Sequence, residues 1–193
     1  SYPVWFRKWA GNPDAFISEM YDFDLAYSGD LLTCGRLAEP TVAGVYLGYI
    51  RYTNVGGALD KWFTRYHWDP TNSLTTFLPA DSAEIMGCKF MQQQTWGGVD
   101  FVPTKIIAFV KRGPLTTGYK DGGLLSIDAA NGNVLKYVKF TKVDSNNQFN
   151  LALTAQNFGG YMSNHDDLSG KPLFTVLDFN LEVMMHIIPK EAR

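Results

Sequence analysis

The sequence predicts an all-β fold, and two observations carry that prediction. The first is a hairpin within residues 122–140, in which an apolar arm, Leu124 to Asp128, precedes an alternating arm, Asn133 to Phe140. Between the arms, Asn131 and Gly132 supply the positive-φ residues that a tight turn needs. The second observation is that no segment sustains the 3.6-residue apolar period of a helix, whereas the order strand, glycine turn, strand recurs along the chain.

The first third of the chain is expected to form strands separated by turns. Asp22 to Tyr27 alternates with period two, although the preceding Phe16 to Tyr21 also fits a helical turn. Ser28-Gly29-Asp30 then turns the chain into an apolar strand, which predicts a second hairpin. The strands expected in this part are residues 4–9, 22–27, 31–35, 42–52 and 58–66.

The rest of the chain repeats this pattern with longer loops. We expect loops where polar residues and glycine gather, at residues 92–100, 113–122 and 163–171. In the alignment of these parts Cys88 falls where Cys34 falls, so the two cysteines are predicted at equivalent, buried positions of adjacent sheets. The further strands expected are residues 74–78, 83–91, 105–111, 149–155, 158–162, 172–178 and 181–188.

These elements predict a single all-β domain, 1–193, made of three blade-like four-stranded antiparallel repeats. The approximate repeats are 16–68, 72–141 and 144–189, and an orphan strand at 4–9 resembles the strands that close them. Four short strands per repeat are typical of propeller blades, so a propeller or partial propeller is expected, with a β-sandwich or barrel as the alternative. Three blades and one strand do not close a ring, which takes about four blades or more.

The hairpin also resembles the repeat of a known protein family. Leu124 to Tyr137 contains an apolar strand, Asp128-Ala129-Ala130-Asn131-Gly132 and an aromatic-bearing strand, which is similar to the blade ending of quinoprotein-type (pyrroloquinoline-quinone-like) β-propellers. Gly56 to Trp62 is similar, with Trp62 where Tyr137 stands, and Phe174 to Met185 is a degenerate third example. The resemblance implies propeller architecture. Catalytic members bind a quinone and calcium, often beside an adjacent Cys-Cys pair that this chain lacks, so their activity is not implied.

Charge and hydropathy exclude some classes of partner. Seventeen basic and nineteen acidic residues leave a formal net charge of −2, and basic residues cluster no further than the pairs Arg7-Lys8 and Lys111-Arg112. Binding to nucleic acid is therefore not expected. Apolar runs are only a few residues long, against the roughly 20 that span a bilayer, so no membrane span is expected.

No motif assigns a catalytic or metal-binding role. His67, His165 and His186 lack the paired spacing of metal ligands, and no Gly-x-Ser-x-Gly element is present. Asp144 to Gln148 alternates oxygen-bearing side chains as a calcium loop does, but it lacks that loop's glycine and its bidentate glutamate. We therefore expect no catalytic residue, no metal site and no cofactor, and the chain is not expected to be an enzyme.

Three residues remain as candidates for binding: Trp96, His165 and Asp166. Trp96 lies in the polar segment 92–100, where an aromatic ring can contact a glycan or a peptide. His165 and Asp166 belong to the His-carboxylate cluster of the expected loop 163–171.

The function expected from these features is a non-enzymatic structural or protein-interaction module, part of a larger assembly or filament. The end sheets of three blades would expose apolar residues, here Trp5, Trp9, Met184 and Met185, so protein partners or self-association are expected. The alternatives are a carbohydrate-binding, lectin-like domain and a non-catalytic fragment of a larger propeller enzyme. A glycan is accordingly the other partner class considered.

Overall fold

The described part of the chain is all-β. The computed structural model describes residues 18–26, 28–38, 46–54, 59–66, 82–93, 102–113, 121–140, 153–155, 161–166, 172–178 and 180–187. They form four-stranded antiparallel sheets, which confirms the predicted class. Within these ranges no helix is long and apolar enough to cross a membrane.

Each sheet is a meander in which consecutive strands are neighbours. The first sheet contains β1 (Ser18–Leu25), β2 (Leu31–Ala38), β3 (Tyr46–Thr53) and β4 (Asp60–Tyr66). The second contains β5 (Ser82–Gln93), β6 (Val102–Gly113), β7 (Asp121–Asp128) and β8 (Val134–Phe140). The third and smallest contains β9 (Leu153–Ala155), β10 (Tyr161–Asp166), β11 (Pro172–Leu177) and β12 (Val183–Ile187).

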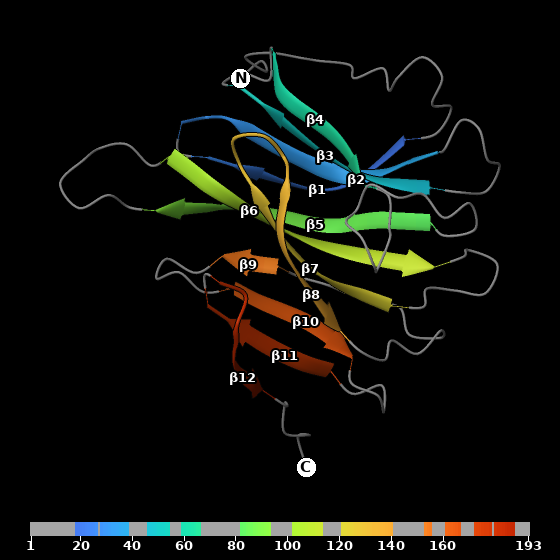
Figure 1. Ribbon diagram of the computed structural model, residues 1–193, viewed down its shortest axis with the longest axis vertical. Coiled ribbons are helices and arrows are strands. Elements are labelled where there is room, and N and C mark those ends of the chain that lie inside the picture. The colour runs from blue at the N-terminus through green and yellow to red at the C-terminus, as the bar shows by residue number, and fades with distance from the viewer. Residues whose placement is uncertain are drawn as a thin grey trace, which may run out of the picture.

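The second sheet lies between the other two, and Figure 1 shows the sheets following one another from the first to the third. One apolar cluster joins the first and second sheets, and its largest members include Ile50, Phe90 and Ile106. A second cluster joins the opposite face of the second sheet to the third sheet, through Phe109 and Leu177 among others. Burial on both faces explains the near-continuous apolar run of β6, where Ile106 to Val110 are all buried.

The predicted hairpin at residues 122–140 is confirmed as β7 and β8, but its turn differs from the expected one. Only Gly132 has positive φ, at 79°, whereas Asn131 does not. The loop is longer than two residues, since the N–H of Gly132 donates to the carbonyl of Asp128 at 2.9 Å. Asn131 instead closes the loop with its side chain, which accepts a hydrogen bond from the N–H of Asn133 at 2.8 Å.

Several predicted strands change their extent or partner. β1 starts at Ser18, so the described residues 18–21 of the segment 16–21 form a strand and not a helical turn, with a bulge between Met20 and Asp22. β5 is one twelve-residue strand whose described partner is β6. Consequently Cys34 lies in the second strand of its sheet and Cys88 in the first strand of the next, so the prediction that they are equivalent is wrong. The strands expected at residues 4–9 and 74–78 lie outside the described ranges.

Candidate functional site

The three residues predicted to bind are not brought together as a described site. Trp96 lies outside the described residues. His165 and Asp166 do not lie in a loop, because β10 continues through them and pairs them with Leu173 and Pro172 of β11. The polar composition of this segment was misleading, since the pairing of the backbone does not depend on apolar side chains.

Metal binding finds no geometric support in the described ranges. They contain no group of three or more His, Cys, Asp or Glu side chains placed to hold a metal ion. The calcium-like segment 144–148 lies outside them.

The polar groups that do converge lie between the first and second sheets, around Arg36 of β2. Its Nη1 donates to Oε1 of Glu84 on β5 at 2.5 Å, and its Nη2 donates to Oε1 of Glu19 on β1 at 2.9 Å. The hydroxyl of Tyr21 donates to Oε2 of Glu19 at 2.9 Å, and the guanidinium stacks 4.2 Å from the ring centroid of Tyr46. Arg36 thus connects the carboxylates of two sheets.

The pKa shifts of this cluster favour fixed protonation states. Burial would lower the pKa of Arg36, but hydrogen bonds to Glu19 and Glu84 outweigh it and raise the pKa. The hydrogen bond from Arg36 lowers the pKa of Glu19. Burial, assisted by Glu19, raises the pKa of Tyr21. Acid–base catalysis needs a group that titrates near the working pH, whereas a permanent ion pair beside a protonated tyrosine suits a structural tie.

A second tie joins β1 to the edge of β5. Oδ2 of Asp22 accepts from the N–H of Cys88 at 3.1 Å, and Oδ2 of Asp24 accepts from the N–H of Phe90 at 2.8 Å. Nζ of Lys89 donates to both carboxylate oxygens of Asp22, at 3.1 and 2.9 Å. The two aspartates therefore occupy hydrogen-bonding positions of β5, which is an edge strand among the described strands of its sheet.

A third polar cluster joins Asp30, which directly precedes β2, to Tyr52 of β3 and Lys61 of β4. Oδ2 of the buried Asp30 accepts from the hydroxyl of Tyr52 at 3.0 Å and from Nζ of Lys61 at 2.5 Å. Burial alone would raise the pKa of Asp30, but hydrogen bonds from Lys61, Ser28 and Tyr52 outweigh it and lower the pKa. The ammonium of Lys61 is also 4.6 Å from the centroid of the Tyr52 ring.

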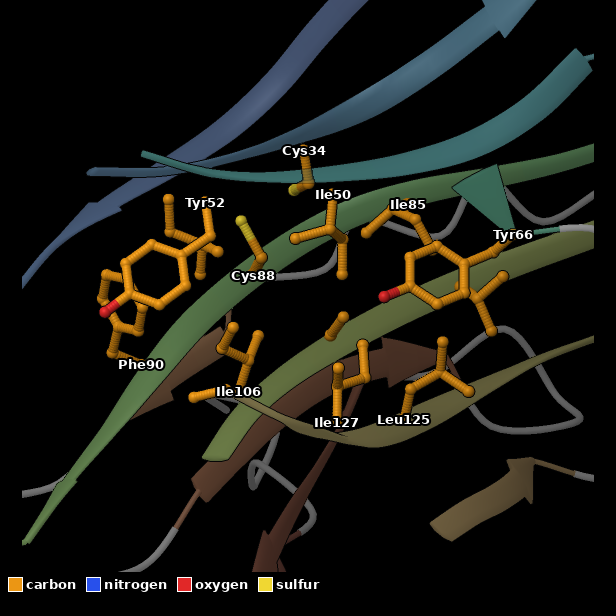
Figure 2. Close-up of a cluster of buried hydrophobic side chains, with 14 of the residues drawn as sticks. Cys34, Ile50, Tyr52, Tyr66, Ile85, Cys88, Phe90, Ile106, Leu125 and Ile127 are labelled. Carbon is orange, nitrogen blue, oxygen red and sulfur yellow. The ribbon is translucent and has the colours of Figure 1, made fainter. Parts of the chain in front are cut away.

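The two cysteines face each other across the same interface. Figure 2 shows Cys34 from β2 and Cys88 from β5 beside Ile50, and both thiols are free and fully buried. Burial raises the pKa of Cys88, and a hydrogen bond with Cys34 adds to the shift. The prediction that both thiols are buried is confirmed, and a thiol with a raised pKa is a poor nucleophile.

The fourth strand of each of the first two sheets reaches the turn of the following sheet. Nε1 of Trp62 donates to the carbonyl of Ala129 at 2.8 Å, and the hydroxyl of Tyr66 donates to the carbonyl of Gly132 at 2.9 Å. One sheet further on, Nζ of Lys136 donates to the carbonyl of Asn180 at 2.8 Å and pairs with the carboxylate of Glu182. The contact therefore occurs twice with different donors.

The arrangement is chemically a set of links between sheets. Sequence reasoning missed Arg36, Glu84 and Asp22, although the alternating acids of β1 are a visible signal for such links. The chain matches no protein-family model and no curated protein. A proposal about function therefore has to be argued from the contacts between the sheets.

Proposed function

We propose that this protein is a non-enzymatic structural module whose four-stranded sheets are successive blades of a propeller-type repeat, and that it works as part of a larger protein assembly. The observation that carries the proposal is the repeated link from a fourth strand to the next turn, made by Trp62 and again by Lys136.

The strand pairing of the first two sheets supports a repeat. In the first sheet the bulge falls between Met20 and Asp22, opposite Gly35 and Cys34. In the second sheet it falls between Ile85 and Gly87, opposite Val110 and Phe109. Another bulge lies near the start of the fourth strand in all three sheets, whereas the irregularity between Met91 and Gln92 is described in the second sheet alone. Bulges kept at matching places are expected of units built on one plan.

The polar clusters support a structural role over catalysis. The described hydrogen bonds of Arg36, Asp22 and Asp30 run to neighbouring strands, although the buried Nε of Arg36 has no hydrogen-bond partner among the described residues. An active site instead presents such groups to a substrate in a cleft. The resemblance of residues 124–137 to quinoprotein-type blade endings agrees with this architecture and brings no catalytic residue with it.

The size of the native particle tests the proposed function. An extract of the source cells is fractionated by size under native conditions, and the chain is detected with an antibody. We expect it in particles several times its own mass of 21.6 kDa. Elution as a free monomer would overturn the proposal, and saturable sugar binding on a glycan array, lost in Trp96→Ala, would replace it with the lectin function.

A further inference from the structure

The two cysteines of the chain meet where the first two sheets pack on each other. Cys34 lies on β2 and Cys88 on β5, and both side chains are 0% exposed. Figure 2 shows their sulfur atoms pointing toward one another across the interface, and a hydrogen bond connects the two side chains. The chain has only these two cysteines, so folding brings every thiol of the protein to one place.

Asp22 fixes the position of one cysteine relative to the other. It is the partner of Cys34 in the ladder between β1 and β2, and its Oδ2 accepts from the backbone N–H of Cys88 at 3.1 Å. Nζ of Lys89 donates to the same oxygen at 2.9 Å. The backbones of the two cysteines are thus tied through one side chain, so bringing the sulfur atoms together requires no change in which strands are neighbours.

The surroundings favour a bond between the two sulfur atoms over metal binding. The described part of the chain contains no group of three or more metal-ligating side chains, whereas a structural zinc site takes about four ligands. The other side chains of the cluster are apolar or aromatic, among them Ile50 and Phe90. A disulfide carries no charge and needs no polar partner, so it suits such an interior.

We propose that Cys34 and Cys88 form a disulfide when the first interface opens in the presence of a small-molecule disulfide such as oxidised glutathione, and that this bond then holds the two sheets together. The thiolate of one cysteine attacks the small disulfide, forms a mixed disulfide and releases one small thiolate. The thiolate of the other cysteine attacks the protein sulfur of the mixed disulfide and releases the second. Two electrons pass from the protein to the small disulfide, and the two cysteine protons end on the released thiols.

Opening is required because neither thiol is accessible in the packed interface. Both side chains are fully buried, and burial raises the pKa of Cys88. The reaction is therefore slow while the sheets are packed and proceeds during folding or local opening. The bond encloses residues 35–87 in a covalent loop, which opposes renewed separation of β2 from β5. The inference goes beyond the proposed function, because it holds for a single copy of the chain.

The test refolds the reduced, purified full chain from urea with and without oxidised glutathione. Mass spectrometry is expected to find one bond, between the peptides of Cys34 and Cys88. The melting temperature of the oxidised chain is expected to be about 5–15 °C above that of the reduced chain, and dithiothreitol should abolish the gain. The controls Cys34→Ala and Cys88→Ala keep one thiol each and should gain nothing from the oxidant.

A pair of variants tests the dependence on opening in native buffer. Asp22→Asn removes the charge that pairs with Lys89, so the sheets separate more easily and the bond should form about fivefold faster or more. Lys136→Met, the matched control, removes an exposed ion pair at the other interface and should leave the rate unchanged. Thermal melts of the reduced variants check that each is folded.

Three results would overturn the inference. The first is a parent chain whose thiols both stay free after refolding with the oxidant, a comparison that depends on no variant. The second is a bond that leaves the melting temperature unchanged or lowers it. The third is a rate of bond formation in Asp22→Asn that equals that of the parent chain.

Discussion

The second sheet packs on the first sheet through one face and on the third through the other, and the described contacts of the two faces differ. The first interface combines apolar packing with the ion pair of Arg36 and Glu84 and the aspartates of β1. The described contacts to the third sheet are apolar side chains such as Phe109 and Leu177, together with the exposed pair of Lys136 and Glu182.

This difference separates stabilisation of an interface from alignment of its two sheets. Burial of apolar surface is not directional, so it stabilises both interfaces without fixing how one sheet sits on the other. Charge-assisted hydrogen bonds require particular geometries, and those of Arg36 and Asp22 tie particular residues of β1 and β2 to β5. The first two sheets should thus have the more closely specified alignment.

The largest effects are expected from removing one large buried side chain from either apolar cluster. Phe90 lies in the first cluster and Phe109 in the second, and both side chains are fully buried. Phe90→Ala and Phe109→Ala should each lower the free energy of unfolding by about 3–5 kcal/mol, because each removes a buried ring and leaves a cavity. Urea denaturation measures both losses. A separate early transition in Phe109→Ala alone would show that the third sheet unfolds independently, contrary to one cooperative stack.

The next largest effect is expected from removing the ion pair at each of the two interfaces. Arg36→Met should cost about 2–3 kcal/mol, since it removes the guanidinium that is hydrogen-bonded to the buried carboxylate of Glu84, while Lys111, the cross-strand partner of Glu84, keeps one positive charge nearby. The matched change at the other interface, Lys136→Met, should cost about 1 kcal/mol or less, because its pair with Glu182 is exposed.

A double variant separates the pair from simple loss of packing. Arg36→Met combined with Glu84→Met should recover much of the stability lost in Arg36→Met, as apolar replacement of a buried ion pair often does. Strictly additive losses in the denaturation midpoints would mean that the two side chains do not interact across the interface.

Much of this fold could be predicted from residue pattern, and the failures have physical causes. The hairpin of β7 and β8 was predictable because Asp128, Asn131 and Gly132 are local turn signals. The place of Cys88 in its sheet was predicted wrongly, because strand register and not local composition decides which residues are equivalent, and a polar segment such as Ser163 to Asp166 can still form a ladder. Matching Trp62 to Tyr137 by their aromatic side chains was wrong by one residue, because strand register places Lys136, and not Tyr137, at the position of Trp62.

The third prediction compares the turns that receive the two fourth-strand links. Gly132 has φ of 79°, and a Cβ added there would lie 2.7 Å from Oγ1 of Thr64 and 2.9 Å from Cε3 of Trp62. Gly132→Ala should therefore cost about 2 kcal/mol, from the left-handed backbone and from the clash together.

The corresponding turn of the third sheet has Leu181 at positive φ, 60°, and its side chain is buried in the second cluster. Leu181→Gly relieves about 1 kcal/mol of backbone strain but loses roughly 1.5–3 kcal/mol of apolar burial. It should therefore destabilise the protein slightly. A gain in the melting temperature of Leu181→Gly would show that the packing of this turn on the second sheet contributes little.

The smallest effect distinguishes two aspartates of the first sheet by the sign of their pH dependence. The pKa of Asp30 is lowered below its ordinary 3.8, because hydrogen bonds from Lys61, Ser28 and Tyr52 outweigh burial. Its contribution is then present above about pH 4 and is lost as pH falls through the folded pKa. The pKa of Asp24 is raised by burial, against the hydrogen bond from Phe90, so its contribution is lost as pH rises through the folded pKa.

Urea denaturation between about pH 2 and pH 6 compares the parent chain with Asp30→Asn and Asp24→Asn. The stability advantage of the parent over Asp30→Asn, at most about 1 kcal/mol given the partly exposed Lys61, should grow with pH. Its difference from Asp24→Asn should change in the opposite direction. Parallel pH profiles for the two variants would contradict the distinction between a carboxylate held by a cation at the turn and one held by a backbone N–H at the sheet interface.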